Sequence, residues 1–305
     1  MTSNPYSTPV LVVIFNRPDK AQKMLEVLRQ IKPARLYVAA DGARADRPDE
    51  AQLCAATRAV FANVDWPCQV QTDFLTENIG PCKRVPTAID WLFTQEEEGI
   101  ILEDDCLPDP SFFPYCAKLL EKYRDDDRVM TISGSNFQGG KKRGEASYYF
   151  SIYPTTWGWA TWRRAWALYD DKMTDWPAFQ KEERIKQVMP TASRSERNYW
   201  LSFFDKGYRR KFIFWDLRWI FTMWDHGALS AVPNQNLIKN IGFGKDATHT
   251  KEEGSDLSIE TKQLGVISHP TAIVANEAAD RYLYRKVYRI SFWQKVKYKL
   301  NDFFS

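Results

Sequence analysis

The stretch Val10-Leu-Val-Val-Ile-Phe15 is followed at once by Asn16-Arg-Pro-Asp19. Its six residues are apolar and mostly β-branched, which is typical of a strand covered on both faces. Pro18 suits the first turn of a helix, and Met24, Leu25 and Leu28 share one helical face as far as about residue 30. The stretch therefore predicts a buried strand that leads directly into a helix.

The same alternation of strand and helix continues outward from this stretch. We expect strands at 36–40, 68–74, 99–102 and 129–133, with helices between them at about 49–62, 80–93 and 109–123. Alternation of this kind requires crossover connections and a mostly parallel sheet, whose ligands bind beyond the carboxyl ends of the strands. The sequence thus predicts an α/β, Rossmann-like fold with a central sheet flanked by helices. Arg17, Asp41 and Asn78 follow predicted strands and are candidate binding residues.

The fourth predicted strand runs directly into Glu103-Asp104-Asp105. Side chains alternate along an extended chain, so Glu103 and Asp105 are expected on one side and Asp104 on the other. Neighbouring carboxylates in a cleft repel each other, and a divalent cation would relieve the repulsion. Hard oxygen ligands suit Mg²⁺ or Mn²⁺, with diphosphate oxygens completing the shell. The alternative is a solvated acidic turn, as we expect for Asp125-Asp126-Asp127.

The composition is that of a globular protein. Of 305 residues, 44% are apolar and 27% charged, which excludes a disordered, collagen-like or coiled-coil chain. Five cysteines without a CxxC pair indicate reduced thiols and a cytoplasmic protein. We expect neither a signal peptide nor a transmembrane helix. The net charge of +3 gives no argument for nucleic acid as a partner.

The order of these motifs resembles that of the GT-A glycosyltransferases. The similarity is closer to the N-acetylglucosaminyltransferase I type, whose acidic motif is Glu-Asp-Asp, and to bacterial nucleotide-diphospho-sugar transferases. It covers about residues 9 to 250 and rests on the strand-end residues above together with Ile101-Leu-Glu-Asp-Asp105, Trp157-Gly-Trp159, Trp215-Asp216, Ile241-Gly-Phe-Gly244 and Ala247-Thr-His249.

The resemblance implies roles for individual residues. Arg17 and Asp41 would hold the nucleotide, and Asp104 would lie beside the ribose. Asp105 would be the direct metal ligand, and Glu103 would face the donor sugar. Asp216 would correspond to the catalytic base, although Trp215-Asp-Leu-Arg-Trp219 has one residue more between its tryptophans than the family's Trp-Asp-Asp-Trp stretch.

Other residues complete the expected site. His249 follows two glycines in a polar loop and is a candidate ligand for the metal or a phosphate. Trp157 and Trp159 flank a glycine, and flat indoles suit the apolar face of a sugar ring, so we expect them in the acceptor or sugar pocket. In this interpretation residues 1–275 form one GT-A domain, with a nucleotide-binding half at about 1–135 and an acceptor half at 136–275.

The expected activity is that of a hexosyl- or N-acetylhexosaminyltransferase. A sugar would pass from a nucleoside diphosphate, with UDP favoured, to a hydroxyl of a glycan or lipid-linked acceptor. Asp216 as a single general base implies inversion; alternatively, Asp216 pairs with Arg218. Two other functions compete: a sugar-1-phosphate nucleotidyltransferase, which needs a Gly-rich loop absent from 15–18, and a non-catalytic carbohydrate-binding protein.

The C-terminal segment, 276–305, has a different pattern. Apolar residues recur at helical spacing from Leu283 to Phe303, and residues 281–305 contain seven Lys or Arg against Asp302 alone. A basic amphipathic helix of this type can lie on an anionic membrane, which would make the protein peripheral on a cytosolic face. The alternative is a helix that docks on its own domain or on a second subunit of a homo-oligomer.

Overall fold

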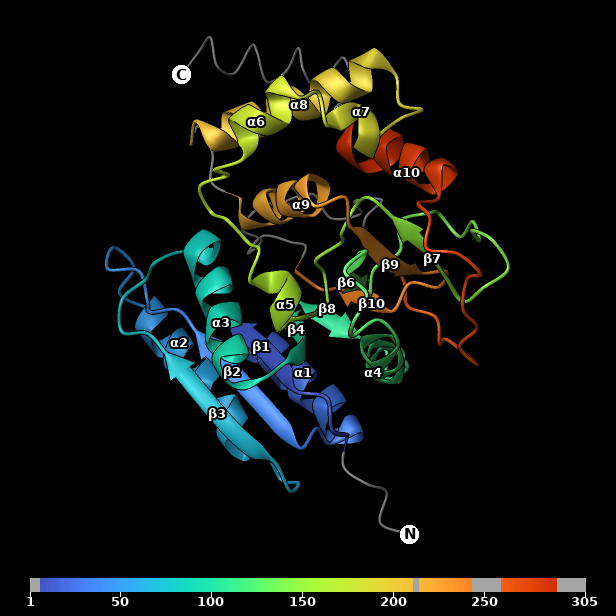
Figure 1. The fold of residues 1–305 in the computed structure, drawn as a ribbon. Coiled ribbons are helices and arrows are strands. Elements are labelled where there is room, and N and C mark those ends of the chain that lie inside the picture. The colour runs from blue at the N-terminus through green and yellow to red at the C-terminus, as the bar shows by residue number, and fades with distance from the viewer. Residues whose placement is uncertain (1–5, 211–213, 243–258, 290–305) are drawn as a thin grey trace.

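The computed structural model describes residues 6–210, 214–242 and 259–289. Its main sheet has eight strands in the order β3-β2-β1-β4-β8-β6-β9-β7 (Figure 1). The first four in that order are parallel to one another, which confirms the predicted α/β fold with a mostly parallel, Rossmann-like sheet. These strands are β1 (Val10–Ile14), β2 (Arg35–Ala40), β3 (Gln69–Phe74) and β4 (Glu98–Glu103).

The other half of the sheet is mixed. The strand β8 (Trp159–Trp162) is antiparallel to both β4 and β6 (Val129–Ser133). Beyond β6 lie β9 (Leu229–Pro233), which is parallel to it, and the antiparallel edge strand β7 (Tyr148–Ser151). A separate pair joins β5 (Cys106–Pro108) to β10 (Ile238–Asn240), so the segment after β10 lies beside the acidic residues that end β4.

Helices cover both faces of the sheet. One face carries α1 (Pro18–Ile31) and α4 (Phe112–Lys122), whereas the other carries α3 (Pro81–Gln95) and α9 (Trp215–Asp225). A further helical layer lies above α9 (Figure 1). The remaining helices are α2 (Glu50–Val60), a 3₁₀ turn at Phe61–Asn63, α5 (Arg163–Trp166), α6 (Trp176–Lys181), α7 (Ile185–Val188), α8 (Arg194–Tyr208) and α10 (Glu277–Leu283).

The continuous apolar run of β1 is explained by burial on both faces. Val10, Val12 and Ile14 pack with α1 and α4, and Leu11 and Val13 pack with α3 on the opposite face. All five side chains are buried. A strand in this position leaves no residue to face solvent, which is why its sequence lacks alternation.

Tryptophans hold α9 against the sheet. Trp215 stacks on Trp159 at 6.0 Å between ring centroids, and Trp219 lies 5.8 Å from the same ring. The indole N–H of Trp219 donates to Thr131 Oγ1 at 3.0 Å, and that of Trp224 donates to the Ile152 carbonyl at 2.7 Å. These bonds satisfy the polar atom of each buried ring and fix the direction of the helix.

The described part of the C-terminal segment packs on the body of the protein. Leu283 and Tyr284 are buried, and the Tyr288 ring lies 5.2 Å from Tyr153 and 4.9 Å from Trp200. Helix α10 and the π-helical turn Tyr284–Tyr288 are thus docked on the domain. This is the arrangement that we gave as the alternative to a membrane-bound helix. The rest of the predicted apolar stripe, from 290 onward, lies outside the described residues. Within the described residues, no helix has the length and apolar character to cross a bilayer.

Asp280 on α10 makes stability depend on pH. Its carboxylate accepts hydrogen bonds from Ser151 Oγ and the Ile152 amide, yet burial raises its pKa from 3.8 to about 7. The folded chain therefore binds a proton that the unfolded chain releases, and the free energy of unfolding falls as pH rises from about 4 to 7.

We expect Asp280→Asn to flatten this dependence, because the amide cannot ionise. Chemical denaturation at intervals from pH 4 to 8 measures the slope, and Asp127→Asn, which changes an exposed acid, is the matched control. Burial also raises the pKa of Glu196, so a smaller slope should persist in the variant. An undiminished slope in Asp280→Asn would contradict this account.

Candidate functional site

A cleft of about 340 Å³ opens at the carboxyl ends of β1, β2 and β4. Most of the residues that the sequence singled out meet in it, from segments far apart along the chain. The cleft is lined, among others, by Arg17, Asp41, Asn78, Glu103, Asp104, Asp105, Trp157 and Asp216. This is the edge where ligands of open α/β sheets bind.

Arg17 joins two carboxylates at the centre of the cleft. Its Nη1 lies 3.0 Å from Asp104 Oδ1 and 2.8 Å from Asp105 Oδ2. Asp104 is 4% exposed and also accepts the Phe15 N–H at 3.2 Å. Burial raises the pKa of Asp104, while the Arg17 guanidinium opposes that rise. Arg17 therefore supplies the charge that allows Asp104 to be buried.

Glu103 is the third carboxyl group of the motif. Burial is the main cause that raises its pKa, followed by the charges of Asp105, Asp104 and Asp216. A protonated carboxyl group donates a hydrogen bond as well as accepting one. Glu103 is thus suited to contact a hydroxyl group of a ligand.

Asp41 organises the wall of the cleft. Its carboxylate accepts the N–H groups of Gly42 at 3.0 Å, Ile79 at 2.9 Å and Gly80 at 2.8 Å. Asn78 Nδ2 donates to the Gly42 carbonyl at 2.8 Å. These bonds fix the loop before α3, so the N-terminus of that helix opens into the cleft. A direct contact of Asp41 or Asn78 with a nucleotide stays a prediction.

Two arginines in the cleft were missed by the sequence analysis. Arg44 is held by the buried Glu50 and lies over the Phe15 ring at 5.5 Å. Arg84 is 2% exposed and pairs with Asp73 at 2.8 Å, but its Nε has no hydrogen-bond partner among the described residues. The position of Arg84, in the first turn of a helix that starts at a strand end, was the available signal. Both arginines add positive charge to the lining.

Asp216 lines the cleft from α9, on the side opposite Arg17 and the acidic motif. It is the second residue of α9, and its Oδ1 accepts the Leu217 N–H at 2.9 Å. Its carboxylate lines the same cleft as Glu103 and Cys82, and its charge raises the pKa of both groups. The stacking of Trp215 on Trp159 fixes this end of the helix.

The two tryptophans around Gly158 have different environments. Trp157 is half-buried, lines the cleft and contacts the Phe137 ring at 5.3 Å. Trp159, which we expected in the same pocket, is only 1% exposed and belongs to the core. Trp157 precedes β8, and the positive φ of Gly158 breaks the extended backbone between the two rings, so they point to different places; this corrects the expectation for Trp159. Gly158 has a φ of 62°, and an added Cβ would collide with Ile238.

The surroundings of Asp105 match those expected of a metal-binding carboxylate only in part. Its main-chain carbonyl accepts the Ile241 N–H at 2.8 Å, and a Cβ on Gly242 would overlap its Oδ2. Within the described residues, no group of three or more His, Cys, Asp or Glu converges as a metal site. Mg²⁺, however, is usually held by one or two carboxylates together with substrate phosphates, and this donor set fits that mode. His249 lies outside the described residues.

Comparisons with known proteins give only distant similarities among solved structures. Neither protein-family models nor curated protein sequences give a match to this chain. Among solved structures, the chain is similar to 4-diphosphocytidyl-2C-methyl-D-erythritol synthase from Anaerococcus prevotii at 10% identity, with a TM-score of 0.35 over 65% of this chain and 84% of that chain. It is also similar to UDP-glucose pyrophosphorylase complexed with UDP-glucose at 11% identity, with a TM-score of 0.28 over 48% of this chain and 62% of that one. Likeness at this level carries no argument about fold or activity.

Removal of Arg17 should destabilise the protein, because it leaves Asp104 and Asp105 without their shared cation. We expect Arg17→Gln to lower the free energy of unfolding at pH 7 by roughly 3 kcal/mol, as for other broken buried ion pairs. Urea denaturation measures the change. Lys23→Gln, on the exposed face of α1, should stay within about 0.5 kcal/mol of the unchanged protein. Equal effects of the two substitutions would show that the Arg17 pairs contribute no net stability.

Proposed function

We propose that the protein transfers a sugar from a nucleoside diphosphate, preferably UDP, to a hydroxyl of a glycan or lipid-linked acceptor. The observation that supports this most is the arrangement of the cleft. Arg17 with Asp104 and Asp105 forms one wall, and Asp216 approaches Glu103 from the other. A charged leaving group and an attacking hydroxyl would meet complementary groups on these two walls.

Three arginines of the lining would bind the diphosphate of the donor. Arg17, Arg44 and Arg84 contribute guanidinium groups, and the N-terminus of α3 lies among them. Guanidinium groups form charge-assisted hydrogen bonds with phosphates, and helix N-termini attract anions. The unpaired Nε of Arg84 adds a buried donor to this region.

Mn²⁺ or Mg²⁺ is the cofactor that the acidic motif implies. Asp105 would hold it together with diphosphate oxygens, beside Gly242, and His249 is the further expected ligand. Such an ion would neutralise charge on the departing diphosphate. Arg17 would share Asp105 with the ion and keep Asp104 charged.

Asp216 would act as the general base. The acceptor hydroxyl loses its proton to Asp216 while its oxygen bonds to the anomeric carbon, and the bond from that carbon to the diphosphate oxygen breaks. Attack opposite the leaving group inverts the anomeric carbon. Glu103 would bind a hydroxyl of the donor sugar, and the exposed part of Trp157 would contact a sugar ring.

A sugar-1-phosphate nucleotidyltransferase is the second candidate, since the fold suits both reactions. Such an enzyme needs a flexible, Gly-rich loop after the first strand to surround a triphosphate. Here only Phe15, Asn16 and Arg17 separate β1 from α1, and the Phe15 N–H is used by Asp104. Pro18 offers no N–H at all. The short connection between β1 and α1 therefore favours the glycosyltransferase over the nucleotidyltransferase.

The setting of the reaction is also part of the proposal. We infer a cytoplasmic enzyme, with residues beyond 289 as the candidate for contact with an anionic membrane or a second subunit. Either partner would suit an acceptor attached to lipid.

Substitution of the base tests the chemistry. We expect Asp216→Asn to lower kcat by about 10²–10⁴, the usual contribution of a general base, with UDP binding unchanged. Release of UDP from a panel of UDP-sugars measures the rate, and isothermal calorimetry measures the binding. Asp205→Asn, on the outer helix α8, is the control. Full activity in Asp216→Asn would remove the proposed base.

Metal removal tests the acidic motif. We expect UDP to bind in Mn²⁺ and to lose at least tenfold in affinity in EDTA, and we expect Asp105→Asn to show the weaker affinity in both buffers. Identical UDP binding in Mn²⁺ and EDTA would contradict a metal role. Formation of UTP from a UDP-sugar and pyrophosphate would instead identify the nucleotidyltransferase.

A further inference from the structure

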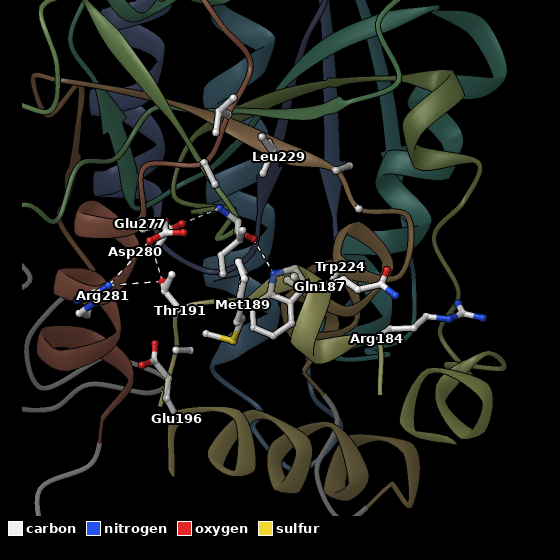
Figure 2. A pocket seen from close by; sticks show the side chains of 18 of the residues that line it. Arg184, Gln187, Met189, Thr191, Glu196, Trp224, Leu229, Glu277, Asp280 and Arg281 are labelled. Atoms are coloured by element: carbon white, nitrogen blue, oxygen red, sulfur yellow. Dashed lines mark hydrogen bonds and ion pairs between the residues drawn. The ribbon is translucent and has the colours of Figure 1, made fainter. Parts of the chain in front are cut away.

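A second cavity, of about 330 Å³, lies apart from the cleft and shares no lining residue with it (Figure 2). It is enclosed by the C-terminal end of α9, the end of α7 with the residues that follow it (187–192), the start of β9 and α10. Asp216 and Asp225 mark the two ends of α9, so the cavities are roughly 14 Å apart along that helix. The proposed function uses none of the residues in this second cavity.

One side of the cavity carries hydrogen-bonding groups of both kinds. Thr191 Oγ1 donates to Glu277 Oε2 at 2.8 Å, and Arg281 Nη2 lies 3.5 Å from the same hydroxyl and 4.0 Å from Glu277 (Figure 2). At another point of the lining, Arg184 pairs with Asp225 at 2.6 Å. The cavity thus presents both donors and acceptors, with two arginines against the four carboxyl groups of Glu196, Asp225, Glu277 and Asp280.

Glu196 is the group with the most unused capacity. It is 7% exposed and lines the cavity, yet it forms no ion pair with a described residue. It stands at the capping-box position of α8, where Ser193 Oγ accepts the Glu196 N–H at 3.2 Å. The Ser193 amide and three nearby arginines lower the pKa of Glu196, but burial outweighs them. Since a carboxylate has about four acceptor sites, most of its capacity is left for a ligand.

The other side of the cavity is apolar. Ile152, Met189 and Trp224 are buried beneath it, and Val274, at its edge, is 68% exposed. The Trp224 N–H is already used by the Ile152 carbonyl, so this ring offers only its carbon surface. Pockets for small molecules combine an apolar surface with a few placed polar groups in this way.

We propose that this cavity is a second carbohydrate-binding site, for a neutral monosaccharide or disaccharide. Sugar hydroxyls both donate and accept, which matches Glu196 on one hand and Arg281 with Thr191 on the other. The C–H face of a sugar ring matches Met189 and Trp224. The volume lies near the lower end of the range of roughly 300–1,000 Å³ for ligand pockets and is compatible with a small sugar.

Binding of free sugars, without nucleotide or metal, tests the proposal directly. Methyl glycosides of glucose, galactose, mannose and N-acetylglucosamine are titrated into the full chain, with ligand-observed NMR as the readout. We expect saturable binding of at least one glycoside. Glu196→Gln should weaken it about tenfold, as for loss of a hydrogen bond to a charged group. Thr191→Trp, at an exposed position on the rim, should abolish it.

Controls separate this cavity from the cleft. Glu145→Gln, which changes an exposed acid, should bind as the unchanged protein does, and so should Trp157→Ala in the cleft. Circular dichroism checks that each variant folds. If Thr191→Trp does not fold, the result for Glu196→Gln alone decides the test. The test contains no nucleotide-sugar donor, so failure of free sugars to bind would not contradict the proposed transfer reaction. Failure of the transfer reaction would likewise not contradict a sugar site in this cavity.

Three outcomes would overturn the proposal. They are absence of binding by every glycoside, loss of binding in Trp157→Ala with retention in Thr191→Trp, and binding of spermidine in place of sugars with loss in Glu196→Gln. The last outcome would identify a site for organic cations.

Discussion

The Arg17 guanidinium between Asp104 and Asp105 is the interaction on which the cleft depends. Because β1 and β4 are adjacent and parallel, the residues after each strand necessarily meet at one edge of the sheet. The acidic motif brings three carboxyl groups to this edge, and burial there disfavours the charged forms of Glu103 and Asp104. Arg17 lies within reach only because Pro18 begins α1 two residues after Asn16, without an intervening loop. Fold and charge balance are thus fixed by the same short segment.

A second constraint comes from the aromatic core between the sheet and α9. The α/β half of the molecule alone would leave the acidic motif facing open solvent. Trp159 and Trp219 anchor α9 so that its first turn carries Asp216 to the cleft, and its last turn closes the second cavity. Packing that has no chemical role of its own therefore sets the distance between the two walls.

The sequence predicted those features that depend on local pattern. The strands at 10–14, 35–40 and 129–133 match expectation within a residue or so, since apolar runs between turn residues define them. Features that depend on tertiary contacts were missed or misplaced: Arg44 and Arg84 reach the cleft through long side chains fixed by Glu50 and Asp73. Trp159 was misplaced because the Trp-Gly-Trp spacing does not tell that Gly158 adopts a positive φ and that every residue of β8 is buried. The short strands β7 and β9 also lack a distinctive pattern, since they pair with distant partners.

The unequal burial of the tryptophans has an optical consequence. Most indoles around α9 are shielded from water, whereas Trp157 is half-buried at the cleft. Indole emission responds to the polarity around the ring, so the signals of Trp157 and of Trp215, which also lines the cleft, are the components most sensitive to what occupies it. The chain thereby contains an intrinsic fluorescent reporter of cleft occupancy and requires no attached dye.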